Sequence, residues 1–157
     1  MEIMSFHEVI KRGLEFTGDV CFSGEYGQQV YTKEDYEGGV PVEGILYERY
    51  PNGNLIYYAY YHKGVPHGQR VHFYPSGKIK SYCIMDEGTI DGEYIEWYEN
   101  GNVKCTKNSK YGLMIQMKEY DIQGNIVEEK TELNEWEKGI FEKRQRLYEH
   151  RADEGKI

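Results

Sequence analysis

Hydrophobic and polar residues alternate in short runs through the middle of the chain, and a turn signal interrupts them at a fixed spacing. The signal reads YPNGNL at 50–55, YPSGKI at 74–79 and YENGNV at 98–103, each 24 residues after the last. The runs around it are rich in Tyr, Val, Ile, Phe and Trp, a composition typical of strands. Each unit is therefore predicted to be a β-hairpin.

Each turn signal carries a dipeptide that suits a tight turn. The three pairs are Asn52-Gly53, Ser76-Gly77 and Asn100-Gly101. Such pairs take positive φ angles at little steric cost, so a two-residue primed turn is expected at each. Links such as KGVPHG and DEGTIDG return the chain for the next unit.

Aligned on the opening glycine, the units are 44–67, 68–91 and 92–111, followed by a looser fourth at 112–130. A period of 20 to 24 residues with two strands per unit predicts a mainly β fold, an elongated antiparallel meander sheet that grows by one hairpin at a time. In the fourth unit Tyr120 precedes DIQG, one residue longer than the other signals, so a different turn is expected there.

Equivalent side chains of successive units should form ladders across the sheet, about 10 Å apart because a second strand intervenes. One ladder is Tyr50, Tyr74 and Tyr98, with Tyr120 as a possible fourth member; two others are Tyr47, Val71, Ile95 and Arg49, Phe73, Trp97. By alternation the last of these lies on the face opposite the tyrosines. Packing between neighbouring hairpins is the expected role of the aromatic ladder.

The two ends of the chain differ from the repeats, as caps should. Ser5 and Glu8 form a capping-box pattern at the start of a short helix predicted over 5–15. Residues 18–43 indicate a degenerate leading hairpin. A closing helix over 133–150 is expected to cover the last strands with one apolar stripe: Leu133, Trp136, Ile140, Phe141 and Leu147.

This organisation predicts one domain over 1–157. Residues 1–43 would form an N-terminal cap, 44–130 four hairpin repeats, and 131–157 a C-terminal helix with a loose tail. Charges at Glu8 and Lys11 interrupt the N-terminal segment, so neither a signal peptide nor a membrane span is expected and the protein is assigned to the cytoplasm.

Charge narrows the choice of partner. The net charge of -8 argues against a nucleic-acid or anionic-membrane binder. Residues 1–43 hold three basic and nine acidic side chains, so most of the imbalance precedes the repeats. Glu25, Glu34, Asp35 and Glu37 could serve solubility, or could form a docking surface for a basic protein partner.

The unit G-x(4-5)-Y-[PE]-[NS]-G-x-[LIV] resembles the variant MORN repeat, carried here by Gly44, Tyr50 and Gly53 and by their equivalents in the next two units. A short N-terminal helix followed by several such repeats is similar to the YwqK-type antitoxins, or immunity proteins, of bacteria. The resemblance implies a cytoplasmic immunity protein or antitoxin. Together with the acidic, tyrosine-rich surface, it leads us to expect a non-catalytic protein without a cofactor that neutralises a basic toxin domain by occlusion. The alternative is a MORN-repeat scaffold that tethers proteins or a membrane.

The run YYAYY at 57–61 carries tyrosine on both faces of its strand. Alternation places Tyr58 and Tyr60 on one face and Tyr57 and Tyr61 on the other. Tyrosine is an efficient contact residue for protein partners and also a good packing residue. Both interpretations stay open, and Tyr58 and Tyr60 are candidate partner-binding residues.

Candidate catalytic and metal sites are weak. His62 and His72 should lie far apart along their strands with His67 in a loop, so no metal site is expected. Glu48, His72 and Glu96 share one repeat position, too far apart for acid–base work.

Because none of these residues form a convergent catalytic site, an enzyme is not expected. The cysteines do not suggest a catalytic or disulfide role either. The chain has three cysteines and no C-x-x-C pair, which suits free thiols in a reducing compartment, and Cys83 and Cys105 should be half-buried.

Overall fold

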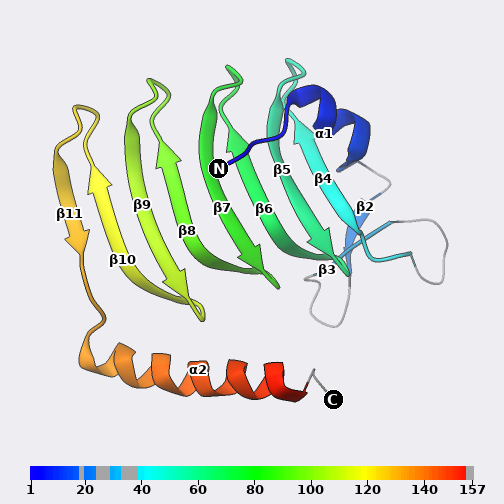
Figure 1. Cartoon of the computed structure of the whole chain (residues 1–157). Coiled ribbons are helices and arrows are strands. Elements are labelled where there is room, and N and C mark those ends of the chain that lie inside the picture. The colour runs from blue at the N-terminus through cyan, green and yellow to red at the C-terminus, as the bar shows by residue number, and fades with distance from the viewer. Residues whose placement is uncertain (18–19, 24–28, 33–38, 155–157) are drawn as a thin grey trace.

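The computed structural model describes residues 1–17, 20–23, 29–32 and 39–154, and it is mainly β. Nine strands form one open sheet, and from β4 onward each strand pairs antiparallel with the next in the chain (Figure 1). The strands are β1 (Leu14–Glu15), β4 (Gly44–Arg49), β5 (Leu55–His62), β6 (Val65–Phe73), β7 (Ile79–Asp86), β8 (Thr89–Trp97), β9 (Val103–Lys110), β10 (Leu113–Tyr120) and β11 (Ile126–Lys130). The predicted meander is confirmed, and β1 makes the sheet mixed because it adds parallel to β4.

The primed turn predicted at Asn52-Gly53 is wrong. The Gly53 N–H donates to the Tyr50 carbonyl (2.9 Å), and within this turn only Gly53 has a positive φ, at 92°. This is a three-residue loop with glycine in the left-handed position. Pro51 fits the position after Tyr50 in such a loop because its ring holds φ negative, but it is not required, since Glu99 takes the same position in the third loop.

The primed turns lie at the other end of each hairpin, in the links between units. Glu87 and Gly88 have φ of 44° and 87° between the paired residues Asp86 and Thr89. Both central residues of a two-residue primed turn need positive φ, so this is that turn. Two further links share the geometry, at Lys63-Gly64 and Tyr111-Gly112.

The fourth turn also corrects an expectation. Asp121 donates from its N–H to the Asn125 carbonyl (2.8 Å) and accepts from Gly124 N–H (3.0 Å), which is the geometry of the other three turns. Asp121 therefore occupies the ladder position, and Tyr120 precedes it. Asp121 replaces the tyrosine because its carboxylate accepts the N–H groups of Gln123 and Asn125 within the turn.

The tyrosine ladder joins neighbouring hairpins by hydrogen bonds. Each hydroxyl donates to a backbone carbonyl of the next unit: Tyr50 to Phe73 (2.8 Å), Tyr74 to Trp97 (2.7 Å) and Tyr98 to Tyr120 (2.9 Å). Because the acceptors are backbone atoms, the ladder does not depend on the residue type in the next unit.

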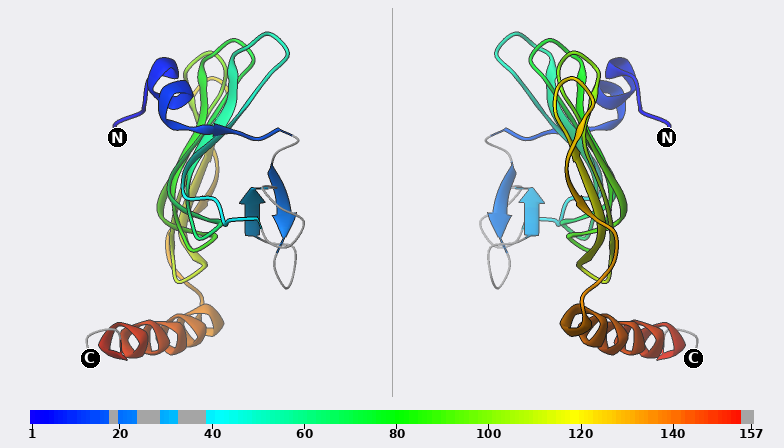
Figure 2. Two further views of the ribbon diagram at one scale, coloured as in Figure 1. Left: turned by 90° about the vertical axis from the view of Figure 1, so that its right-hand side faces the viewer. Right: turned by 90° about the vertical axis from the view of Figure 1, so that its left-hand side faces the viewer.

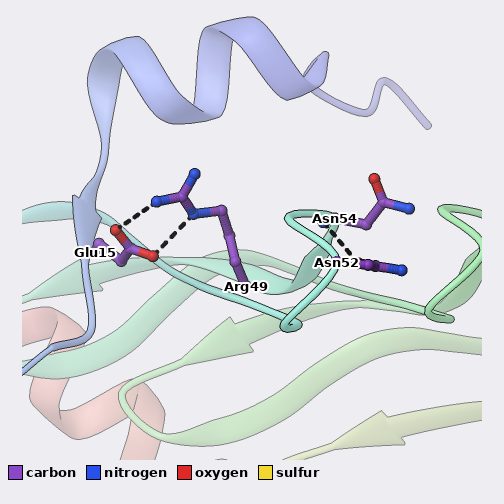
Figure 3. Close-up of polar contacts among 4 residues, drawn as sticks. All are labelled: Glu15, Arg49, Asn52 and Asn54. Atoms are coloured by element: carbon purple, nitrogen blue, oxygen red, sulfur yellow. Dashed lines mark hydrogen bonds and ion pairs between the residues drawn. The ribbon is translucent and has the colours of Figure 1, made fainter.

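Amide side chains add a second set of links at the turns. Asn54 donates to the Pro75 carbonyl (2.8 Å), and Asn102 to the Ile122 carbonyl (2.9 Å). Figure 3 shows Asn52 beside Asn54, whose N–H donates to the Asn52 side chain (2.9 Å). The Asn52 side chain thus stabilises its own turn, and the Asn54 side chain links that turn to the next one.

Two caps cover opposite faces of the sheet at its N-terminal end (Figure 2). Helix α1 (Phe6–Arg12) begins with the predicted capping box of Ser5 and Glu8 and places Val9 in the core. The hairpin of β2 (Val20–Ser23) and β3 (Gln29–Thr32) forms a separate two-stranded sheet on the other face. An ion pair links the side chains of β1 and β4: Arg49 donates from Nε and Nη2 to the two carboxylate oxygens of Glu15, at 2.9 Å and 3.0 Å (Figure 3).

The closing helix does not cover the last strands as predicted. Helix α2 (Glu135–Glu154) lies across the strand ends, below the sheet in Figure 1. It docks on one hairpin turn, where the Phe141 ring lies 5.2 Å from that of Tyr111 and Arg144 donates to the Tyr111 carbonyl (2.9 Å). Trp136 stays 75% exposed and Leu147 56% exposed, so the predicted apolar stripe is only partly used.

Candidate functional site

One row of side chains crosses the whole sheet on the α1 face and changes character along the way. Its members, in order from β4 to β11, are Tyr47, Tyr58, Val71, Tyr82, Ile95, Thr106, Lys118 and Glu129. Tyr58 and Val71 are completely buried. At the far end Lys118 and Glu129 form an ion pair of 3.7 Å in solvent. The apolar part of the row is where α1 packs.

The sheet therefore has two parts, which we call the covered half (β4–β7) and the open half (β8–β11). Val9 of α1 packs against Ile45, Tyr47 and Tyr58 in the covered half. On the opposite face, Val20, Val30 and Val42 pack against Leu46. In the described part of the chain, neither a helix nor a second sheet lies over the faces of the open half (Figures 1 and 2).

The open half carries a broad polar hollow of about 580 Å³ on the α1 face. Short and long polar side chains line it, among them Thr106, Asn108, Gln116, Lys118 and Glu129. These groups can donate and accept hydrogen bonds but do not converge on one point, so the surface suits contact with another macromolecule better than it suits chemistry on a small substrate.

Strand β11 forms the free edge of the open half, and no described strand pairs with its outer side. Ile126 and Val127 are 52% and 63% exposed, and Ile122 in the preceding turn is 50% exposed. An edge strand offers unpaired N–H and C=O groups to an added strand. Exposed apolar side chains beside such an edge mark a surface for protein contact.

The two candidate tyrosines belong to the covered half. Tyr58 is fully buried: its hydroxyl accepts from Met4 N–H (3.0 Å) and donates to the Gln69 side chain. Tyr60 is partly buried, and its hydroxyl donates a hydrogen bond to the Met4 sulfur (3.1 Å). The structure thus uses Tyr58 for packing under α1, where a partner does not reach it, and it is left out of the proposed contact surface.

The four acidic candidates, Glu25, Glu34, Asp35 and Glu37, lie outside the residues that the structure describes. They remain a prediction from the sequence. The contact residues that sequence reasoning missed are those of the β11 edge, including Ile126 and Val127. Their signal in the sequence is an apolar pair in the last repeat with no further unit to pair with it.

The histidines are arranged differently from the prediction. His67 lies within β6 and its ring is 6.0 Å from that of His62. A carboxylate lies beside each of these two histidines: Glu43 is 3.0 Å from His62 Nδ1, and Asp86 is 3.4 Å from His67 Nδ1. Among the described residues no three His, Cys, Asp or Glu side chains are placed to hold a metal ion.

Glu48, His72 and Glu96 do share one row, with Tyr57 and Ser81 standing between them. Burial, followed by the charges of Arg70 and Lys80, lowers the pKa of His72 to about 4. His72 is therefore neutral at pH 7.

The cysteines are more buried than predicted. Cys83 is 1% and Cys105 5% exposed, and burial raises the pKa of both thiols. Both side chains pack as small apolar groups. They are poor nucleophiles because the raised pKa keeps the thiols protonated.

Comparison with known proteins identifies the repeat. Residues 42–63, 66–85 and 90–111 match the family described as MORN repeat variant. The matched segments follow the three hairpin units of β4 to β9, and the fourth hairpin lies beyond them.

One curated relative is Immunity protein YwqK of Bacillus subtilis (strain 168). It is 40% identical over 58 residues, which cover 37% of this chain and 36% of that protein. The aligned part is thus about a third of the relative's length. No solved structure matches this chain. Among the described residues, neither helix combines the length and the apolar composition that a membrane span needs.

Proposed function

We propose that this chain is an immunity protein that binds a bacterial toxin and neutralises it by occlusion, without catalysis. The observation that carries the proposal is the open half: a broad surface with a free strand edge, in a chain whose repeats are similar to an immunity protein. The covered half holds the fold together, so the open half is available for the partner.

The free edge suggests how the partner binds. Addition of a strand to β11 would give main-chain hydrogen bonds, and Ile126 and Val127 would add apolar contact. Glu119 and Glu128 are paired neighbours on one face of this edge, so a strand with a basic residue opposite them fits better than a second copy of β11. This agrees with a basic toxin domain as partner.

Charge supports the same partner. The nine acidic residues of 1–43, including Glu25, Glu34, Asp35 and Glu37, would speed encounter with a basic domain. Charge reversal of those four residues should slow association and reduce its salt dependence. A complex whose association rate is the same at low and high salt would contradict the electrostatic part of the proposal.

The direct test uses the protein encoded by the adjacent reading frame. Its C-terminal domain is expressed in a bacterial host with and without this chain, and growth and complex formation by size-exclusion chromatography are measured. We expect growth to be restored only when the chain is present, with a stable complex. Continued growth arrest together with separate elution of the two proteins would overturn the proposal.

A matched pair of variants locates the contact. Val127→Lys places a charge at the β11 edge, and Phe6→Lys makes the same change at an apolar residue of α1 that is 43% exposed and belongs to the covered half. Affinity for the toxin domain should fall about tenfold or more for Val127→Lys and stay unchanged for Phe6→Lys. Equal stability of the two variants in urea denaturation is checked first. Equal affinities would exclude the β11 edge.

A repeat scaffold that tethers proteins or a membrane is the second candidate, because the MORN repeat variant itself is a framework on which different functions are built. Co-sedimentation with anionic vesicles separates the two. We expect the chain to stay in the supernatant, since its net charge is -8.

A further inference from the structure

A small hollow opens on the face opposite α1, at the border of the two halves. Ser81 of β7, which is 8% exposed, lines it, and Cys83, which is 1% exposed, is the next residue on the same face of that strand. The register places Cys83 between Arg70 of β6 and Tyr94 of β8. Short side chains between long ones leave a space of about 280 Å³, which is large enough for one side chain and too small for a typical cofactor.

Two cations, Arg70 and Lys80, and one carboxylate line the hollow, since His72 is neutral at pH 7. Arg70, His72 and Lys80 line it together with Ser81, Tyr94 and Glu96. The Nε of Arg70 is buried, and in the described part of the chain it has no hydrogen-bond partner. A buried donor without an acceptor is costly, and native structures leave few of them.

The one carboxylate in the lining already has partners. Glu96 lies 3.5 Å from the Lys104 ammonium and accepts from the Tyr94 hydroxyl (3.2 Å). The ring of Tyr57 lies 5.5 Å from that of His72 and adds no charge. The cations Arg70 and Lys80 therefore outnumber the single carboxylate of the hollow.

We propose that this hollow binds a carboxylate group, held by the Arg70 guanidinium and the Lys80 ammonium with the Ser81 hydroxyl as a further donor. A guanidinium suits a planar carboxylate, to which it can donate two parallel hydrogen bonds. Glu96 on the opposite wall would repel a dianion, so a phosphate group fits less well than a carboxylate. The inference stands on this hollow alone and does not rest on the proposed toxin.

The test is a titration followed by amide and histidine NMR of isotopically labelled protein. Two probes distinguish a free small carboxylate from an acidic side chain: acetate, and a blocked tripeptide with a central glutamate. Chloride at matched ionic strength is the control for salt. We expect the signals of Ser81, Tyr94 and His72 to shift with a carboxylate and not with chloride.

The two probes also report the source of the ligand. Tighter binding of the tripeptide assigns the hollow to an acidic side chain of a protein, while tighter binding of acetate assigns it to a small metabolite-like carboxylate. Tighter binding of inorganic phosphate than of either probe would overturn the choice of a carboxylate.

Variants make the result specific to the hollow. Arg70→Gln should weaken carboxylate binding about tenfold, the loss expected for a charge-assisted hydrogen bond, and Arg70→Lys should weaken it less. Lys143→Gln removes one positive charge from the exposed side of α2, outside both surfaces, and should change nothing. Absence of shifts in the wild type, or equal losses for Arg70→Gln and Lys143→Gln, would overturn the proposal.

Where Arg70→Gln fails to fold, Lys80→Gln at the exposed rim serves in its place. It should weaken the binding of the tripeptide several-fold while the amide spectrum of the rest of the sheet stays unchanged. Unchanged affinity of Lys80→Gln would contradict the role of this ammonium and the proposal with it.

Discussion

The covered and open halves of the sheet are built on the same repeat but differ on the face toward α1. At one repeat position the chain has Tyr58, then Tyr82, then Thr106, each 24 residues after the last. The first is fully buried beneath α1, and the last lines a polar hollow. A change of side chain at one position thus turns a core surface into an exposed one.

The hydrogen bonds between neighbouring hairpins are the same in both halves. Tyr50 in the covered half and Tyr98 in the open half make the same hydroxyl-to-carbonyl bond to the next unit, at 2.8 Å and 2.9 Å. Ladders that use backbone acceptors hold the open half in register, although Cys105 and Met117 are its only buried apolar side chains among the described residues. This lets half of the sheet stay uncovered.

The largest expected effect comes from emptying the core of the covered half. Tyr58→Ala should reduce the free energy of unfolding by about 3–5 kcal/mol, because it leaves a cavity under α1 and removes the hydroxyl bonds. Thr106→Ala, at the same repeat position in the open half, should cost under about 1 kcal/mol. Urea denaturation measures both; equal losses would show that the open half has a hidden core role.

An intermediate effect tests His72 at the border of the halves. Its pKa is about 4 in the folded protein against 6.5 for an unperturbed histidine, so between pH 6.5 and 4 the unfolded chain binds a proton that the folded chain does not. The contribution of neutral His72 to stability is therefore complete above pH 6.5 and is lost as the pH falls toward 4.

The variant His72→Gln should flatten this pH dependence, which amounts to roughly 3 kcal/mol or less. The melting temperature measured between pH 7 and 4.5 reports it. His62→Gln, at an exposed histidine, controls for the loss of one imidazole. A wild type whose stability does not change over this window would contradict the burial of His72.

A smaller effect compares the tyrosine ladder in the two halves. Tyr50→Phe and Tyr98→Phe each remove one hydroxyl-to-carbonyl bond, and each should cost about 1 kcal/mol. Equal losses in thermal denaturation would confirm that the ladder is uniform along the sheet. A loss confined to Tyr50→Phe would mean that the open half is held by other contacts.

The smallest effect is a gain. Glu87 has a φ of 44° in a two-residue primed turn, where asparagine is preferred, so Glu87→Asn should stabilise the protein by about 0.5 kcal/mol.

Tyr111→Asn relaxes a φ of 51° in the same kind of turn but removes the ring contacts with Phe141 and Tyr148. Hydrogen exchange of α2 should then rise; unchanged protection would show that α2 docks by other means.

The hairpin repeat and the α1 capping box could be predicted because each depends on local signals. Turn glycines, alternation and the Ser5–Glu8 spacing act within a few residues. The turn types differ from the prediction because an Asn-Gly pair fits a two-residue turn and also a three-residue loop with only the glycine at positive φ, so the pair alone does not fix the loop length. Tyr120 was misplaced for a similar reason, since Asp121 makes the turn bonds itself.

The candidate site was predicted less well because contact surfaces depend on what is left uncovered. A tyrosine such as Tyr58 fits a core and a partner surface equally in sequence, and only the position of α1 decided between them. The same holds for Trp136, which is at helical spacing for packing and yet stays exposed.

The sequence by itself determined the hairpins, their number and the antiparallel order of β4 to β11, because strand alternation and turn chemistry are local properties repeated along the chain. Only the tertiary structure decided which half of the sheet is covered, where α2 docks, and that Arg70, Lys80 and Ser81 line one hollow. Those outcomes depend on the packing of segments distant in sequence, α1 and the β2–β3 hairpin above all, and no local pattern contains that information.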